Sequence, residues 1–528
     1  MSVRKLVMSL PGYPMIEAKV NYRQFIDLTI VLVVGIVMLS MAWVGYVGSD
    51  DHSYARGALD WLNHLPHPYI GDDHWTLRHP VVIPVAVSLA LFGFREISLG
   101  LPSALLFLLF LGTNYFYLQR FFGAGVALLG TVLLATTPLF VVQATFPQDV
   151  IVQLLAVSSS FCLFYSASRS NGRGRLMFGA GVAAAVAWLT LETTAALLLF
   201  YAILFLIGVG VPRRYYWTMA LAFVLIVGAE IGYFTVLTGD PLYRYRIDLH
   251  HDTVDRAGDV TVAKQSGSLF DLEGNLSVNV FLQPIVALLL NQEFGALFWM
   301  FVPALLWIWK RKPPLEDRHL LKLLSGLGIV WIIFVSFNGS ILWVVPRYYS
   351  VAAWVAVIVV AYWLKQFVLA HWPKMAIVAV AGWLATNLLC VYVENKNPLF
   401  AERALIDYVM LHGESVYTDP MTITRAKLLL EFHGVSERVL SDPAPADALV
   451  YVNRTNIERC KRLGYRCKWR WEHYLPKKDW TELTRMDPQP KRIGVFLGFF
   501  GFDKLIPEEI FNRLAGRNPG AALYRVHS

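Results

Sequence analysis

Two adjacent carboxylates, Asp50 and Asp51, directly follow the first long apolar segment of the chain. The stretch from there to residue 80 also contains Tyr54, Arg78 and His79, together with further acids and histidines. A carboxylate can take a proton from a hydroxyl, and a nearby cation can stabilise a leaving phosphate. The residue types therefore suit a hydroxyl-activating site. They also suit the start of an amphipathic helix, whose first turn favours acidic residues.

Other polar residues further along the chain also have two interpretations. Asp149 begins an apolar segment after TFPQ, and Glu192 interrupts another in WLTLETTAALLLF. Each acid is either a helix-end residue or part of a functional site, because ionisable residues in membrane segments are often functional. Arg347 in VVPRYYS either snorkels at an interface beside Tyr348 or holds a phosphate through its forked guanidinium. Arg244, in the alternating YRYR stretch, is either a membrane anchor or a ligand contact.

The composition is that of a membrane protein. Of the 528 residues, 56% are hydrophobic and only 16% are charged, whereas soluble proteins carry about 25% charged residues. Apolar segments of about 20 residues recur along the chain, which indicates membrane spans. The formal net charge of +8 does not indicate a nucleic-acid partner, because the basic residues are scattered at the ends of apolar segments. In membrane proteins such residues set orientation.

Hydropathy predicts a polytopic α-helical membrane protein with eleven spans, or thirteen if two shorter pieces at 81–92 and 280–290 also cross. Pieces of that length more often lie in the interface or re-enter. The basic clusters at 169–175 and 213–214 support eleven spans, because crossing by the short pieces would move both clusters outside, against the positive-inside rule. The expected spans are 28–47, 99–118, 123–142, 150–167, 176–191, 194–211, 216–236, 294–309, 321–337, 351–363 and 375–393.

The chain divides into two regions by composition. Residues 1–394 form the expected membrane domain, whose outside loop at 48–80 carries the acidic pair. Residues 395–528 have a soluble composition and predict a small α/β domain on the same face, with strands at SVYTD, RVL and ALVYVN and a helix at MTITRAKLLLEFHG. In this topology Asp149, Glu192 and Arg347 all fall on the face that carries the acidic pair.

The sequence contains few signs of cofactor or disulfide chemistry. Paired aspartates and scattered histidines offer metal ligands, but no tight spacing such as HExxH occurs, so we expect no all-protein metal cage. A requirement for a divalent ion is left open. Cys460 and Cys467, in CKRLGYRC, either pair in an oxidising compartment or stay unlinked.

Four stretches of the chain together resemble a known family. In order and spacing, the sequence resembles the GT-C glycosyltransferases of the dolichyl-phosphate-mannose protein mannosyltransferase type, through GSDDHSYARGALDWL, HWTLRHPVVIPVAVSLALFG, FPQDVIVQLL and AWLTLETTAALLLFY. This family includes the bacterial enzymes that transfer aminoarabinose to lipid A. The resemblance covers residues 21–396 in layout and is strongest over 43–201. It implies a GT-C fold and a polyprenyl-phosphate-linked sugar as donor.

The resemblance also implies roles for individual residues. The first outside loop of this family carries an acidic pair and an aromatic residue four positions on, which matches Asp50, Asp51 and Tyr54. Asp50 is therefore the expected catalytic acid, acting as base or orienter for an acceptor hydroxyl. Asp149 matches a second acid at the start of a span, and PRYY implicates Arg347 in phosphate binding.

Two departures from the family pattern concern the donor. The family's Lys-Pro dipeptide appears here as His79–Pro80, preceded by Arg78, so the cation that meets the phosphate stays open among Arg78, His79 and Arg347. The family's Lys-Gly dipeptide appears as Leu191–Glu192, which leaves the donor sugar open.

These observations support one main hypothesis and two alternatives. The main hypothesis is an inverting glycosyltransferase of the cell inner membrane that moves a hexosyl or pentosyl group from a polyprenyl-phosphate donor to an envelope acceptor, such as lipid A, another glycolipid, a polysaccharide or a protein. Its active site and C-terminal domain would face the periplasm. The alternatives are a polytopic transporter or lipid flippase, and a membrane assembly factor. The charges gather at one face and the two halves do not repeat, which disfavours a transporter.

Overall fold

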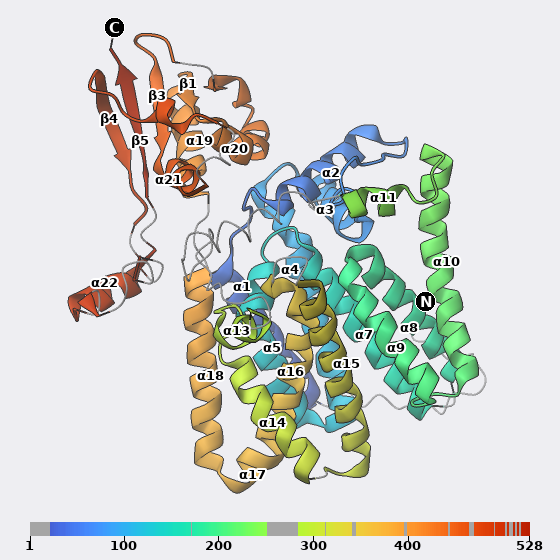
Figure 1. Ribbon diagram of the computed structural model, residues 1–528. Coiled ribbons are helices and arrows are strands. Elements are labelled where there is room, and N and C mark those ends of the chain that lie inside the picture. The colour runs from blue at the N-terminus through green and yellow to red at the C-terminus, as the bar shows by residue number, and fades with distance from the viewer. Residues whose placement is uncertain are drawn as a thin grey trace, which may run out of the picture.

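Long apolar helices make up most of the computed structural model, which describes residues 22–527 except for several internal segments (Figure 1). The segments left out are 171, 251–282, 312, 340–344, 395–398, 442–443, 464–468, 490, 502–503, 506–510, 513–514 and 517–518. Seven of the described helical segments are long and apolar enough to cross a membrane. The protein is therefore a multi-pass membrane protein, as its composition predicts.

Helices overlap all eleven of the expected spans. Seven of these are the long segments, and the others are shorter helices packed among them. The helices of the bundle are α1 (Tyr22–Ala42), α4 (Glu96–Phe122), α5 (Ala124–Thr136), α6 (Pro138–Gln143), α7 (Asp149–Arg169), α8 (Arg173–Thr190), α9 (Ala195–Ile207), α10 (Arg213–Thr238), α14 (Leu297–Arg311), α15 (Leu315–Gly339), α16 (Ser350–Trp363), α17 (Leu369–His371) and α18 (Pro373–Glu394).

The two short apolar pieces form one helix each. The helix α13 (Gln283–Leu290) has 8 residues, which is about 12 Å of helix against a hydrocarbon core of about 30 Å. The helix α3 (His79–Phe92) packs beside α2 (Asp50–His64) at one end of the bundle, close to α11 (Tyr243–His250) (Figure 1). Both observations agree with the expectation that these pieces do not cross.

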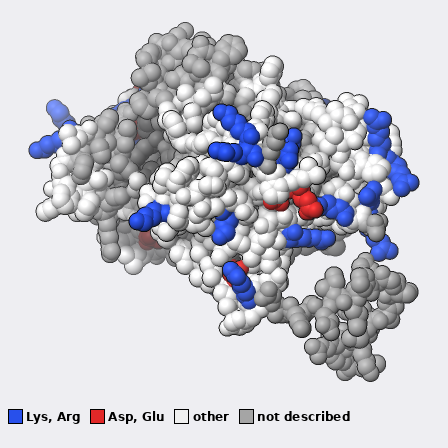
Figure 2. All heavy atoms as spheres, turned by 90° about the horizontal axis from the view of Figure 1, so that it is seen from below, with Lys and Arg blue, Asp and Glu red and all other residues white. Residues whose placement is uncertain are grey.

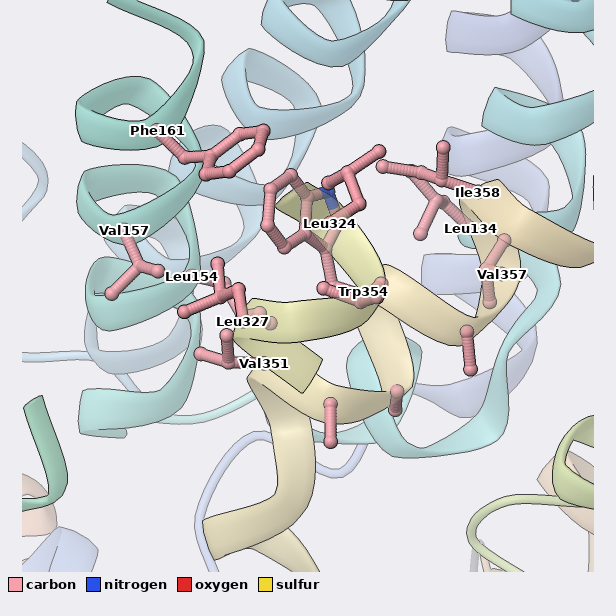
Figure 3. Packing of buried hydrophobic residues seen from close by; sticks show 14 of the residues in the cluster. Leu134, Leu154, Val157, Phe161, Leu324, Leu327, Val351, Trp354, Val357 and Ile358 are labelled. Atoms are coloured by element: carbon pink, nitrogen blue, oxygen red, sulfur yellow. The ribbon is translucent and has the colours of Figure 1, made fainter. Parts of the chain in front are cut away.

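The helix α16 forms the centre of the bundle. Every residue from Ser350 to Tyr362 is buried, as expected for a helix that is apolar on all sides. Its Trp354 packs against Phe161 of α7 and Leu324 of α15 (Figure 3). The one polar atom of that indole is satisfied, because Nε1 donates to the side-chain oxygen of Asn114 at 2.7 Å.

Basic residues gather at the end of the bundle opposite α2 and α3. Seen from below, this face is mostly uncharged, and its charged side chains are mainly Lys and Arg (Figure 2). They stand at helix ends, among them Arg120 in α4, Arg169 in α7, Arg213 in α10 and Lys310 in α14. The candidate site residues lie at the other end.

The chain after α18 forms a small sheet domain. Its five strands are ordered β2-β1-β3-β5-β4, with β1 parallel to β2 and β3, and β5 antiparallel to β3 and β4. The expected strands and helix are present as β1 (Val416–Thr418), β2 (Val439–Leu440), β3 (Leu449–Asn453) and α20 (Pro420–His433). The other elements are α19 (Phe400–His412), α21 (Arg454–Leu463), β4 (Trp480–Met486), α22 (Arg492–Phe499) and β5 (Ala521–Val526). Cys460 is disulfide-bonded, and Cys467 lies outside the described residues.

Candidate active site

The turn before α2 is held by the Asp51 carboxylate. Its oxygens accept hydrogen bonds from the backbone N–H groups of Val47 at 2.6 Å, Ser49 at 2.7 Å and Gly48 at 3.3 Å. Gly48 adopts φ +67°, a left-handed conformation that suits glycine. Asp51 is fully buried. Burial raises the pKa of Asp51 to about 6, against the opposing effect of the three N–H groups. The Asp51 carboxylate therefore stabilises this turn through its three hydrogen bonds.

Asp50 points the other way and meets Arg347. The Asp50 carboxylate lies 2.7 Å from the Arg347 guanidinium, and their side chains are 20% and 23% exposed. Arg347 belongs to the short helix η3 (Pro346–Tyr349), which leads into the central helix α16. The guanidinium carbon also lies 5.6 Å from the centre of the Tyr348 ring. Both members of the pair are reachable from solvent.

A buried cluster lies beside this pair. Arg78, at the start of α3, donates to the carboxylate of Asp149 at 2.7 Å and to the hydroxyl of Tyr54 at 2.8 Å. The Tyr54 hydroxyl in turn donates to Asp149 at 3.1 Å. Asp149 is the first residue of α7, so the helix dipole also stabilises its negative charge. The Asp149 and Arg78 side chains are only 4% and 8% exposed.

Glu192 joins the buried cluster to a second arginine. One of its oxygens accepts from Arg78 at 2.9 Å and the other from Arg244 at 3.0 Å. Glu192 begins the short helix η2 (Glu192–Thr194), which separates α8 from α9. Arg244, in α11, also donates to Glu230 of α10 at 2.8 Å and to Asp248 at 3.3 Å. A continuous chain of charge-assisted hydrogen bonds therefore runs from Tyr54 to Asp248.

Electrostatic coupling connects the exposed pair to the buried cluster. The charges of Asp50 and Arg347 both act on Asp149, and Arg347 also interacts with Tyr54. Seven elements from distant parts of the sequence thus converge at the end of the bundle where α2, α3 and α11 lie (Figure 1).

His79 occupies an aromatic pocket and takes no part in the charge network. Its ring stacks on Phe234 at 5.7 Å and meets the edges of Tyr233 at 5.5 Å and Trp61 at 5.8 Å. Burial and the charge of Arg244 lower the pKa of His79 to about 4. The pKa of His79 thus favours the neutral imidazole at pH 7, whereas Arg78 and Arg347 keep their positive charge.

Two acids of the network were absent from the sequence prediction. Glu230 lies within the apolar helix α10, and an acid in such a segment is itself a sign of function. Asp248 is four residues after Arg244, a spacing that pairs side chains on one helix face. In contrast, Tyr348 contacts the network only through the face of its ring. Among the described residues, no group of three His, Cys, Asp or Glu side chains is arranged to hold a metal ion.

Comparisons with known proteins agree with this architecture. Residues 78–233 match the family model described as dolichyl-phosphate-mannose-protein mannosyltransferase. That range includes Arg78, Asp149 and Glu192. A search of curated proteins gives no match.

Two solved structures are similar to most of the chain. ArnT from Cupriavidus metallidurans, bound to undecaprenyl phosphate, matches with a TM-score of 0.55 and 16% identity, over 86% of this chain and 99% of that one. The archaeal oligosaccharyltransferase AglB from Archaeoglobus fulgidus, in complex with an inhibitory peptide and a dolichol-phosphate, matches with a TM-score of 0.52 and 11% identity, over 96% of this chain and 88% of that one. The protein therefore has the GT-C glycosyltransferase fold, and its residues 78–233 match the family model of the protein mannosyltransferases.

Proposed function

We propose that this protein is an inverting glycosyltransferase that takes a sugar from a polyprenyl-phosphate donor. The observation that carries the proposal is the Asp50–Arg347 pair at 2.7 Å, which is partly exposed and lies beside the enclosed Arg78–Asp149 pair. An acid and a cation side by side suit a reaction that removes a proton at one point and releases a phosphate at the next. The match to a structure holding undecaprenyl phosphate supports a lipid-phosphate donor.

The proposed reaction is a direct displacement at the anomeric carbon of the donor sugar. The acceptor hydroxyl oxygen forms the new bond to that carbon while the bond to the phosphate oxygen breaks. The electron pair of the broken bond leaves with the polyprenyl phosphate, and the hydroxyl proton passes to Asp50. Arg347 then faces the additional negative charge on the phosphate, which its planar guanidinium binds through paired N–H groups.

The buried cluster has a positioning role in this mechanism. Asp149 and Arg78 are nearly enclosed, and each satisfies the other's charge. They tie the starts of α3 and α7 to Tyr54 of α2, one turn beyond Asp50. Glu192 extends the same network and shapes the side of the site toward α11. Fixed dipoles and charges of this kind reduce the reorganisation needed in the transition state.

We infer the placement of the protein in the cell from its charge distribution. We place the basic face of the bundle in the cytoplasm, as the positive-inside rule requires. The active site and the domain at 395–528 then lie on the periplasmic side of a plasma membrane. The acceptor is accordingly an envelope molecule, either lipid A, another glycolipid, a polysaccharide or a protein.

Donor consumption tests the proposed activity. Purified protein in lipid vesicles is incubated with polyprenyl-phosphate sugars of differing sugar identity, each with envelope lipid extract as acceptor. We expect release of polyprenyl phosphate and transfer of label from one of these donors. The absence of release from every donor, with a strain lacking the protein accumulating no lipid-linked sugar, would contradict the proposal.

Sidedness has its own test. Single cysteines at Asp72, near the candidate site, and at Arg214, on the basic face, are exposed to a membrane-impermeant maleimide added to the outside of intact spheroplasts. We expect labelling at position 72 and protection at position 214. The reverse pattern would overturn the proposed orientation.

A further inference from the structure

The C-terminal sheet domain contacts the segment that leads into the proposed catalytic acid. Arg403 of α19 donates to the backbone carbonyls of Val44 and Tyr46, each at 3.1 Å. The same guanidinium forms an ion pair with Glu96, at the start of α4. Arg403 thus ties the sheet domain to the exit of α1 and to the neighbouring membrane helix.

A second arginine of the domain reaches the next residues of this segment. Arg425 of α20 donates to the backbone carbonyl of Val47 at 3.3 Å. A Cβ atom on Gly48 would lie 3.0 Å from the Arg425 carbonyl oxygen, so the glycine allows the two backbones to approach closely. Val47 is therefore held on both sides, because its N–H group donates to Asp51.

Arg425 is itself fixed by the interior of the domain. Its guanidinium lies 3.6 Å from the carboxylate of Glu402, whose side chain is almost completely buried. Glu402 also accepts from the side-chain amides of Asn453 at 3.3 Å and Asn456 at 3.4 Å. The position of Arg425 therefore follows the position of the whole sheet domain.

We propose that the C-terminal domain positions the catalytic carboxylate through Arg425 and Arg403. This inference rests on the proposed function and extends it. The domain fixes the backbone from Val44 to Gly48, and Asp51 transmits that geometry to the start of α2, where Asp50 meets Arg347. A misplacement of about 1 Å in a reacting group reduces turnover by roughly 100-fold. Displacing the domain would therefore slow the transfer step without removing any group that touches substrate.

Kinetics of an Arg425→Ala variant test this positioning role. We expect kcat to fall by roughly 10- to 100-fold, while KM for the lipid-phosphate donor stays within about twofold, because Arg347 and the buried cluster remain. Glu402→Gln, which removes the partner charge and keeps the side-chain size, should give a smaller loss in the same direction. Arg438→Ala, an exposed arginine on the same domain, is the matched control and should leave both constants unchanged.

Amide hydrogen exchange tests the same inference without any turnover. In Arg425→Ala, exchange at residues 47–49 should become faster than in the wild type and faster than in Arg438→Ala. Unchanged exchange at these amides overturns the positioning role whatever the activity. If the wild type is active, an unchanged kcat in Arg425→Ala also overturns the positioning role. If exchange becomes faster in the variant but no donor is consumed by the wild type, only the proposed function fails.

A separate feature of the domain is an apolar stripe on α22. Four large apolar side chains, spaced so that they share one face of this helix and its end, are exposed: Val495, Phe496, Phe499 and Phe500. Phe499 alone is 83% exposed. The opposite side of the helix packs inward, because a Cβ atom on Gly494 would lie 2.4 Å from Ala515. An exposed apolar cluster of this size indicates that this face of α22 contacts an apolar partner.

The position of α22 identifies that partner. Lys491, directly before the helix, donates to the carbonyl of Tyr392, and its ammonium lies 4.6 Å from the centre of that ring. Tyr392 stands at the end of the candidate span formed by α18. Figure 1 shows α22 away from the sheet and level with the upper end of α18. The exposed stripe therefore continues the lipid-facing surface of α18, where Leu388 and Leu389 are also exposed.

We also infer that α22 lies in the membrane interface, with its aromatic stripe in the lipid bilayer. Helices that carry Phe and Leu on one face and basic residues beside it bind in this way. The test uses an environment-sensitive fluorophore on Phe499→Cys, with Cys162 and Cys390 replaced by serine, in vesicles of phosphatidylethanolamine and phosphatidylglycerol containing nitroxide-labelled lipid. The control is Leu411→Cys in α19, which is 81% exposed on the same domain.

Strong quenching at position 499 and little at position 411 is the expected result. Equal quenching at the two positions, or none at position 499, would overturn the membrane contact. If a protein partner covered this stripe, there would be no quenching at position 499.

Discussion

The Asp50 carboxylate and the Arg347 guanidinium lie 2.7 Å apart, although one begins the first extramembrane helix and the other leads into the central helix α16. Their partial exposure separates them from Asp149 and Arg78, which form a similar pair in the interior. A substrate can therefore contact Asp50 and Arg347, whereas Asp149 and Arg78 are already enclosed by protein. We therefore propose that the Asp50–Arg347 pair takes part in the chemistry and that the Asp149–Arg78 pair supports it.

Arg347→Lys should retain the charge and lose the paired N–H geometry that suits a phosphate. We expect KM for the lipid-phosphate donor to rise and kcat to fall, with a combined loss of about 10- to 100-fold in kcat/KM. Arg347→Ala should lose more. Steady-state kinetics with purified protein measure both, and Arg246→Ala, an arginine of α11 whose side chain is largely exposed, serves as a control. Equal kcat/KM for Arg347→Lys and the wild type would contradict the phosphate role.

Arg78→Ala should reduce stability as well as activity. The substitution leaves the Asp149 carboxylate buried without its cation, and removing one partner of such a pair costs about 3–5 kcal/mol. The thermal unfolding midpoint in detergent should therefore fall clearly. An unchanged midpoint would show that the buried cluster does not hold α3 and α7 together.

His79→Phe should behave differently from its neighbour. The wild-type imidazole is neutral at pH 7 because burial and Arg244 lower the pKa of His79 to about 4. A phenyl ring preserves the stacking on Phe234 and the edge contacts with Tyr233 and Trp61. Turnover should stay within about threefold of the wild type, as for a packing change of similar volume. A loss as large as that of Arg78→Ala would restore a catalytic role for His79.

Turnover should decrease as the pH falls below about 6. Burial raises the pKa of Asp51 to about 6, so acidification protonates the carboxylate that accepts three backbone N–H groups and loosens the turn before Asp50. Between about pH 4 and 6 the folded chain keeps a proton that the unfolded chain has released, so this group favours folding more as the pH falls. The loss of turnover should therefore occur without unfolding.

A pH profile of Asp51→Asn checks this assignment. The variant should have low turnover at every pH and should lack the step near pH 6, because its amide cannot titrate. An identical pH dependence in the variant and the wild type would assign the step to another group.

The sequence predicted the apolar helices and brought most residues of the candidate site to one face, because both predictions depend on local patterns. Apolar segments of fixed length give the helices, and the ends of those helices place Asp149, Glu192 and Arg347 on one face. The partners of each residue depend on contacts between distant segments, and no local pattern contains them. The hydrogen bonds of Asp51, the aromatic pocket of His79 and the contact of Arg425 with Val47 are all of this kind.

One strand of the C-terminal domain illustrates the same limit. The strand β4 has mostly exposed residues and the sequence WTELTRM, so it lacks the apolar alternation by which a strand is recognised. It forms because β5 supplies backbone partners along its length. Glu230 is a different case, since an acid within an apolar helix is visible in the sequence and would have extended the predicted network.

The central claim is that Asp50 takes the proton of the acceptor, and the turnover of Asp50→Asn tests it most directly. The measurement is transfer of radiolabelled sugar from a polyprenyl-phosphate donor at saturating concentration, compared with the wild type and with Asp60→Asn, an acid of the same helix outside the network. The account predicts a fall in kcat of about 100- to 10,000-fold for Asp50→Asn, and no comparable change for Asp60→Asn. Undiminished transfer by Asp50→Asn would contradict the mechanism.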